Sequence, residues 1–371
     1  MMRPAFEPAL LRSSDALRFD ALHVPANRRS AEAAWYDVFA LDDERYVVAV
    51  GNVAGAGARP ADLMLAVRES FGAPNTPAEP AALLRAAEAR LRHRYVTAEA
   101  FATATVGIVD RGAQTFTYVS AGHPPPYVRY HDGSVAVLPA DGLPIGLNHC
   151  DHPSAQVVVD LRDAALLMLY SRMLVEASRD VEDGFTRLRT VLEDERMLHC
   201  TSPAAWVARH MLGDSLNAET ALFVCMFGRS RPAPAGRHPH WTASWSFEAT
   251  AGSSNGVRRA FLAALTSKTN GATTLDLAAA ELIFGELLGN VVRHAPGPVD
   301  IVLDWTNELP VLHVFDNGPG FRSRRKRERL PQDDWSESGR GLFIVNACAT
   351  EFEIVNREGR GTHARATLPP A

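Results

Sequence analysis

An acid and an amide stand four residues apart in the C-terminal third of this chain. Glu286 and Asn290 lie in an apolar stretch, residues 275–295, whose periodicity predicts a helix. Residues four apart share one face of a helix. A carboxylate can act as a general base, and an amide oxygen can bind Mg2+, which prefers hard oxygen ligands. The pair fits one end of a magnesium–nucleotide site, although the same spacing also occurs on solvated helix faces.

Two glycine-containing segments follow this stretch. Asp316 ends an apolar run, where its carboxylate can accept a hydrogen bond from an exocyclic amine such as that of adenine. Gly318 and Gly320 allow a tight turn that brings backbone close to a ligand. Asn-Gly is also a typical hairpin dipeptide, so a plain hairpin turn stays open. The segment Gly-Arg-Gly-Leu at 339–342 precedes an apolar helix, and N–H groups at a helix start can hold phosphate.

The helices and strands that would carry these residues form one small domain. The patterns predict helices at about 256–266 and 275–295 and a further helix that starts near residue 341. They predict strands at 300–305, 311–315, 351–356 and 362–368, which together indicate a small sheet covered by helices on one face. Residues 229–241, rich in proline and arginine, are predicted to be a linker between a domain at 1–228 and this one at 242–371.

In this order and spacing, the three segments resemble the nucleotide-binding domain of the GHKL ATPases. The resemblance covers about residues 242–369 and is closest to the anti-sigma-factor serine kinases of bacterial partner-switching systems. It implies an α/β sandwich that binds ATP and Mg2+, with Glu286 as the base for a substrate hydroxyl and Asn290 as the magnesium ligand. It also implies that ATP contacts Asn290, Arg293, His294, Asp316, Gly318, Gly320, Gly339, Arg340, Gly341, Leu342 and Thr362.

A basic run lies between the second and third segments. Six of the eight residues at 322–329 are arginine or lysine. In the GHKL family this position holds a mobile lid over ATP. The run also fits a solvated loop, or a basic surface that meets an acidic partner or the ATP phosphates. Direct binding to nucleic acid is not expected, because no aromatic residues that could stack on bases interrupt the run.

The first half of the chain has a different pattern. Apolar strand-like runs at 46–50, 102–109, 115–119 and 221–226, with helical patterns at 59–71 and 80–94, predict an α+β domain. Motifs at 35–39, 51–57, 120–126, 142–146 and 166–173 resemble the type 2C metal-dependent serine/threonine phosphatases, in their bacterial stage-II-sporulation and stress-regulator branch. The resemblance covers about residues 15–228 and implies a β-sandwich flanked by helices.

This half departs from the phosphatase pattern where metal ligands are expected. Ala34 and Asn52 replace aspartates, Ser171-Arg172-Met173 replaces Thr-Asp-Gly, and the late Asp-Asp pair is lost near residues 217–218. Two clustered divalent ions need several carboxylates. Arg172 would instead put a positive charge at a metal position. We therefore predict a pseudophosphatase used for binding, dimerisation or regulation. The acids at 37 and 42–44, His123 and the polar run 149–152 are interpreted as structural.

The length, composition and charge of the chain limit its domain number, its class of protein and its expected location. The 371 residues suggest two domains, and 46% hydrophobic with 22% charged residues is ordinary for a soluble globular protein. A net charge of −5 excludes a global attraction to nucleic acid or membrane. The four cysteines contain no CxxC pair. The first 25 residues carry too many charges for a secretory leader. No apolar run is long enough to be expected to span a membrane. A cytoplasmic location is expected.

Three functions remain open at this stage. The leading hypothesis is an ATP-dependent serine/threonine protein kinase and anti-sigma-type switch. The family resemblance implies a STAS-fold antagonist of an anti-sigma factor as its substrate, a sigma factor as a further partner, and a homodimer. The second is a non-catalytic module that senses nucleotide and captures a partner. The third, least favoured by the missing acids, is a working phosphatase fused to an opposing kinase.

Overall fold

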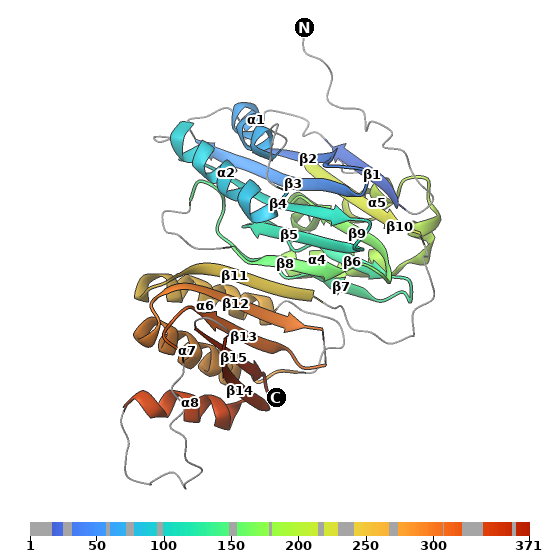
Figure 1. The fold of residues 1–371 in the computed structure, drawn as a ribbon. Helices are drawn as coiled ribbons and strands as arrows, with labels where there is room; N and C mark the ends of the chain where they lie inside the picture. Colours follow the sequence, from blue (N-terminus) through green and yellow to red (C-terminus); the bar gives the residue numbers. More distant parts are fainter. Residues whose placement is uncertain are drawn as a thin grey trace. The chain divides into compact units, whose positions relative to one another are not determined.

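The computed structural model describes residues 17–24, 32–56, 60–71, 78–94, 99–147, 154–177, 180–213, 219–228, 241–266, 274–306, 308–320, 337–357 and 361–371. The chain forms two compact units. The first holds the elements from β1 to β10 and the second holds those from β11 to β15 (Figure 1), with only Gln156 and Val157 at the start of β8 grouped with the second.

The first unit contains two groups of paired strands. One has the order β1 (Leu17–Val24), β10 (Thr220–Phe227), β9 (Ala164–Tyr170), β6 (Tyr127–Tyr130) and β7 (Val135–Val137). The other has the order β8 (Gln156–Asp160), β5 (Thr115–Ala121), β4 (Glu99–Asp110), β3 (Arg45–Ala56) and β2 (Glu32–Ala40).

Helices cover both strand groups of the first unit. α1 (Pro60–Phe71) and α2 (Pro80–Arg94) share an apolar core with β2 to β5, and residues of α3 (Met173–Glu176), α4 (Val181–Glu193), the 3-10 helix η1 (Glu195–His199) and α5 (Pro203–Leu212) share another with β6, β9 and β10. All of Val47 to Val50 on β3 and every residue of β9 are buried. Strands buried on both faces read as continuous apolar runs. The predicted β-sandwich flanked by helices is therefore confirmed.

The second unit consists of an antiparallel sheet and three helices. Its strands follow the order β14 (Glu351–Asn356), β15 (Thr362–Thr367), β13 (Val311–Asp316), β12 (Gly297–Trp305) and β11 (Trp241–Ala249), all paired antiparallel. Its helices are α6 (Ala251–Thr266), α7 (Leu277–His294) and α8 (Glu337–Cys348). Alternate residues of β12 are buried, so one face of the sheet contributes to the apolar core of this unit and the other face does not. The predicted α/β sandwich is confirmed.

Three predicted boundaries in this unit are wrong. α6 begins at Ala251 and not at residue 256, because Thr250 and Ser253 cap it through reciprocal side-chain to backbone hydrogen bonds. α8 begins at Glu337, so that Gly341 lies inside the helix and not before it. Trp241, predicted as the last linker residue, is the buried first residue of β11 and pairs with Trp305.

α7 is the element that carries the acid and the amide. Its start is capped by Asp276, whose side chain accepts a hydrogen bond from the N–H of Ala279 at 2.9 Å. Phe284 stacks on Phe261 of α6 with ring centroids 4.4 Å apart. These contacts fix the rotation of α7 about its axis. No helix in the described parts of the chain is long and apolar enough to cross a lipid bilayer.

Candidate functional site

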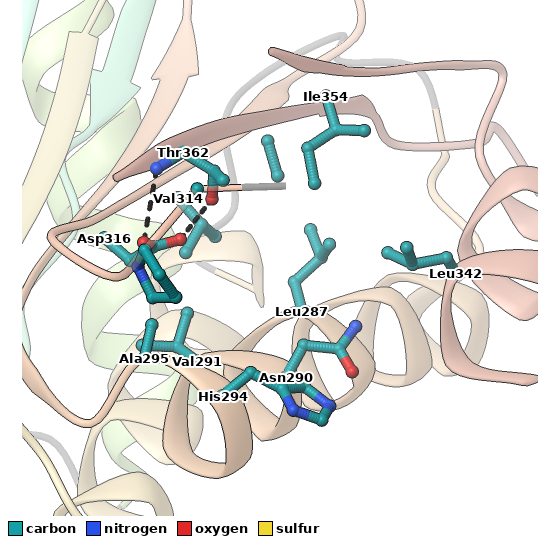
Figure 2. Close-up of a pocket in the computed structure, with 13 residues that line it drawn as sticks. Leu287, Asn290, Val291, His294, Ala295, Val314, Asp316, Leu342, Ile354 and Thr362 are labelled. Atoms are coloured by element: carbon teal, nitrogen blue, oxygen red, sulfur yellow. Dashed lines mark hydrogen bonds between the residues drawn. The ribbon is translucent and has the colours of Figure 1, made fainter. Parts of the chain in front are cut away.

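A pocket of about 280 Å3 opens between α7, the sheet and the start of α8 in the second unit (Figure 2). Apolar side chains dominate its walls, with a few polar groups between them, as is usual for small-molecule sites. The lining residues are Leu287, Asn290, Val291, His294, Ala295, Val314, Asp316, Pro319, Gly320, Leu342, Ile354, Thr362 and Ala364.

Asp316 is the anchored acid of this pocket. It is the last residue of β13 and only 6% exposed. Its Oδ1 accepts hydrogen bonds from the N–H of Gly318 at 2.8 Å and from the N–H of Thr362 at 3.2 Å, and its Oδ2 accepts one from the Thr362 hydroxyl. These three donors satisfy both oxygens of the buried carboxylate. The sequence predicts both residues at the site but not their direct contact, which depends on the pairing of β13 with β15.

Glycines let the chain turn tightly around Asp316. A Cβ on Gly318 would lie 2.4 Å from the Cβ of Ala295, so only glycine fits beneath the end of α7. Gly320 has φ +84° and lines the pocket. Gly361 has φ +91°, and a Cβ there would lie 1.9 Å from the carbonyl oxygen of Asp316. Gly361 was not predicted as a site residue, although a glycine directly before a strand is a signal for such a close approach.

Glu286 and Asn290 lie on the side of α7 that meets α8. A Cβ at Gly341 would be 2.5 Å from Oε2 of Glu286 and 3.6 Å from the amide of Asn290, so a glycine brings α8 close to both. Asn290 lines the pocket, whereas Glu286 is absent from the lining. Oδ1 of Asn290 accepts a hydrogen bond from the guanidinium of Arg293 at 3.2 Å. The acid and the amide are therefore adjacent, but only the amide faces the pocket.

Some of the remaining predicted residues line the pocket and others do not. Leu342 and His294 line the pocket. Arg293 is exposed and also lines a groove of about 270 Å3 between α6 and α7. Gly339 and Arg340 fall in the first turn of α8, and nothing of the Arg340 side chain is described. The basic run at 322–329 lies outside the described residues.

The position of the expected metal centre in the first unit holds uncharged groups. Ala34 pairs with Asn52 across β2 and β3, and Asn52 pairs with Thr103 across β3 and β4. Asn52 is 8% exposed, and neither atom of its amide group has a hydrogen-bond partner among the residues that the structure describes. Oγ1 of Thr103 lies 3.1 Å from Nδ1 of His123, and burial lowers the pKa of His123 to about 3.

Ser171 and Arg172 do not supply metal ligands either. The Ser171 hydroxyl accepts a hydrogen bond from the N–H of Ala221 at 2.9 Å. The Arg172 side chain is 55% exposed and pairs with Glu176 at 3.1 Å. The described residues contain no cluster of three or more His, Cys, Asp or Glu suited to a metal ion. Of the described residues at the expected ligand positions, Ala34, Asn52, Ser171 and Arg172 offer none of the carboxylates that a two-metal centre needs.

Other residues singled out in the sequence have structural roles or are not described. Asp42 accepts hydrogen bonds from the N–H groups of Glu44 and Arg45 in the turn before β3. Asp37 pairs with Arg68 of α1, and burial raises the pKa of Asp37. The polar run at 149–152 and residues 217–218 lie outside the described parts of the chain.

Comparison with known proteins assigns both units. Residues 42–220 match the family model described as stage II sporulation protein E, and residues 247–368 match the model described as histidine kinase-like ATPase domain. The phosphoserine phosphatase RsbU of Bacillus subtilis is 29% identical over 173 residues, which are 46% of this chain and 50% of that protein. The chain thus spans about half the length of this curated relative.

Solved structures with similar folds were also found. The RsbU and RsbW domains of a Mycobacterium tuberculosis protein have a TM-score of 0.48 and 21% identity, over 96% of this chain and 94% of that one. The PP2C phosphatase domain of SpoIIE from Bacillus subtilis, solved with a fragment of its regulatory domain, has a TM-score of 0.48 and 16% identity, over 57% and 63%.

Proposed function

Because the chain is a fusion of a SpoIIE-type phosphatase-like domain and a histidine kinase-like ATPase domain, we propose that it is an ATP-dependent serine/threonine protein kinase and anti-sigma-type regulator of a bacterial partner-switching system. The observation that carries this proposal is the buried carboxylate of Asp316, held by Thr362 in an apolar pocket that Asn290 also lines. The phosphatase-like domain would act without catalysis.

The pocket residues fit ATP. Leu287, Val291 and Val314 offer flat apolar walls for an adenine ring, and Asp316 offers an acceptor for its amine. Asn290 would hold Mg2+ at the opposite end, with His294 near the phosphates. When bound, ATP supplies the phosphoryl group. Glu286 would take the proton from the hydroxyl of the substrate.

The partner follows from the family resemblance in the motifs. We propose a STAS-fold antagonist of an anti-sigma factor as the substrate, modified on a serine or threonine, with a sigma factor as a further partner. We also propose that the protein is a cytoplasmic homodimer that binds neither membrane nor nucleic acid directly. A net charge of −5 is consistent with the last point.

The test compares wild type with Glu286→Gln on a panel of purified STAS proteins. Calorimetry should show magnesium-dependent ATP binding by both, because the glutamate does not line the pocket. Phosphate transfer should fall about 100-fold or more in the variant, which is the usual loss when a general base is removed. Asn290→Ala should lose the magnesium-dependent part of ATP binding. Wild type that binds no ATP at all would contradict the proposal.

A second candidate is a non-catalytic module that senses nucleotide. It is favoured by one observation, namely that Glu286 packs against Gly341 instead of lining the pocket. Wild type that binds ATP yet transfers phosphate to no partner would support this candidate over the kinase.

The inactivity of the phosphatase-like domain is a separate proposal. It rests on Ala34, on the amide of Asn52, which has no hydrogen-bond partner in the described part of the chain, and on the bonded hydroxyl of Ser171. The relative RsbU is named a phosphoserine phosphatase, so the assay should be made directly. Phosphate release from a phosphoprotein, dependent on Mn2+ and lost in a deletion of residues 1–228, would establish a dual phosphatase and kinase instead.

A further inference from the structure

A groove separate from the nucleotide pocket lies between α6 and α7, which run side by side in the second unit (Figure 1). Its volume is about 270 Å3. α7 contributes residues to both sites, but no described residue lines both. With about 3.6 residues per turn, the pocket residues of α7 and its groove residues lie on nearly opposite sides of the helix. The groove is therefore a second cavity that the proposed function does not use.

The floor of the groove is apolar, and two glycines of α7 keep it open. Phe284 and Leu288 are 1% and 3% exposed. A Cβ on Gly285 would meet no atom within 4 Å, and one on Gly289 would meet only the guanidinium of Arg293, at 3.5 Å. Neither glycine has a positive φ, so neither packing nor backbone conformation requires it. Because glycine is less favourable than alanine inside a helix, this pair marks space that is kept for something other than folding.

Two arginines line the groove, and they differ in their partners. Arg258 of α6 pairs with Glu281 of α7, with 2.7 Å between Nη2 and Oε1. Arg293 has no ion pair with an acid among the described residues, and its Nη2 donates a hydrogen bond to Oδ1 of Asn290 at 3.2 Å. A guanidinium is always charged and binds a carboxylate more strongly than a neutral amide. The groove thus offers one positive charge that an anionic ligand can pair with.

We propose that this groove binds a small molecule with an apolar body and a carboxylate. The body would lie on Phe284 and Leu288, across the surface left open by Gly285 and Gly289. The carboxylate would accept two parallel hydrogen bonds from the guanidinium of Arg293. The volume is near the lower end of the range for small-molecule sites, so a short molecule fits better than a helix of a partner protein.

Ligand in the groove would act on the nucleotide pocket through Arg293. Oδ1 of Asn290, the oxygen proposed to hold Mg2+, is the atom that accepts the hydrogen bond from Arg293. A carboxylate that draws the guanidinium into the groove frees this oxygen and moves a positive charge away from the magnesium position. The ligand should therefore raise the affinity for Mg2+, and Mg2+ with ATP should raise the affinity for the ligand by the same factor. This coupling rests on the proposed function, whereas the groove site does not.

The experiment is a titration of the full chain with octanoate, followed by NMR of the ligand. We expect saturable binding with a Kd of about 1 mM or below, which is ordinary for a ligand of this size. Octan-1-ol and octylammonium have the same chain without the carboxylate and should bind about tenfold more weakly or less. Arg293→Gln should weaken octanoate binding about tenfold or more. Arg259→Gln, at an exposed arginine of α6 that does not line the groove, should stay within about threefold of wild type.

A second variant, Gly285→Leu, locates the binding without changing a charge. Its side chain would fill part of the groove, and the variant should fold because the Cβ meets no atom and leucine favours a helix over glycine. Octanoate binding should be lost. Gly285→Ala adds a single methyl group and should stay within about threefold of wild type. Circular dichroism on each variant controls for misfolding.

Wild type that does not bind octanoate, or binding that survives both Arg293→Gln and Gly285→Leu, would overturn the proposal. Equally tight binding of octan-1-ol would overturn the choice of a carboxylate. Saturating octanoate should lower the Mg2+ concentration for half-maximal ATP binding about threefold, and an unchanged concentration would overturn the coupling. Wild type that binds octanoate through Arg293 but binds no ATP would sink the kinase and leave the groove site standing.

Discussion

At the scale of single residues, the bond between Thr362 and Asp316 is the most informative contact of the site. The threonine donates both its N–H and its hydroxyl to the carboxylate. Without the hydroxyl, Oδ2 of the buried Asp316 loses this donor, and the carboxylate group can rotate more freely. An acceptor that is less fixed recognises an amine less well. The orientation of Asp316, and not only its charge, should therefore set the affinity for adenine.

We predict that Thr362→Val weakens ATP binding about tenfold, which corresponds to the loss of roughly one hydrogen bond. Thr362→Ser retains the hydroxyl and is the matched control, expected within about threefold of wild type. Titration calorimetry with Mg2+ and ATP measures both. Equal affinity for the valine and serine variants would mean that the hydroxyl plays no part in holding the acid.

A second residue-scale prediction concerns Gly341. An added methyl group there would meet Oε2 of Glu286, which is the end of a flexible side chain and can move aside. Gly341→Ala should therefore leave the free energy of unfolding nearly unchanged, while phosphate transfer falls about tenfold because the base is displaced. Denaturant titration and single-turnover transfer separate the two effects. A variant that loses stability as strongly as activity would show that α8 cannot accept the methyl group.

At the scale of elements, Gly318 in the turn after β13 packs directly against Ala295 at the end of α7. Gly318→Ala would set two methyl carbons 2.4 Å apart, with no flexible side chain to relieve the overlap. We predict a loss of about 1–3 kcal/mol in the free energy of unfolding, as is typical of overpacking. The second substitution Ala295→Gly should restore most of it, since it removes the opposing methyl group. Urea denaturation of the single and double variants measures this; a double variant no better than Gly318→Ala would place the strain elsewhere.

Helix bounds could be predicted from the sequence where the apolar residues are periodic. The helix at Pro80–Arg94 agrees with its predicted range, because its periodic apolar residues Leu83, Ala87 and Leu91 all face the core. The first turn of α6 was missed, since its Ala-Gly-Ser-Ser-Asn sequence has no apolar period. The Thr250–Ser253 capping pair is the signal that would have identified it.

The site was predictable only in part, for a related physical reason. Glu286 and Asn290 are local, because helix geometry alone puts them on one face. The contact between Asp316 and Thr362 joins residues 46 positions apart and depends on which strands pair and in what register. No local pattern encodes that register, so the motif order supplied it by resemblance. The pairing of Arg172 with Glu176 was likewise not predicted, since it depends on the short helix α3 that brings residues four apart together.

At the scale of the whole molecule, both units contain histidines whose neutral form the folded state favours. His123 in the first unit is 5% exposed, and burial lowers its pKa to about 3. His313 and His363 in the second unit have lowered pKa values for the same main reason. In the unfolded chain each imidazole titrates near pH 6.5. Below that pH the unfolded state binds protons that the folded state does not, so the free energy of unfolding must fall.

The direction and window of this effect can be worked out for His123. Above about pH 6.5 the imidazole is neutral in both states and contributes no pH dependence. From about pH 6.5 down to about pH 3 only the unfolded state gains the proton, and at pH 5 the loss amounts to about 2 kcal/mol. His123→Asn keeps a polar group facing Thr103 but cannot titrate. Its calorimetric unfolding midpoint should therefore change less between pH 7 and pH 5 than that of wild type. An equal change in both proteins would show that the acid sensitivity comes from other groups, and a wild-type midpoint that rises on acidification would contradict the neutral burial of His123 itself.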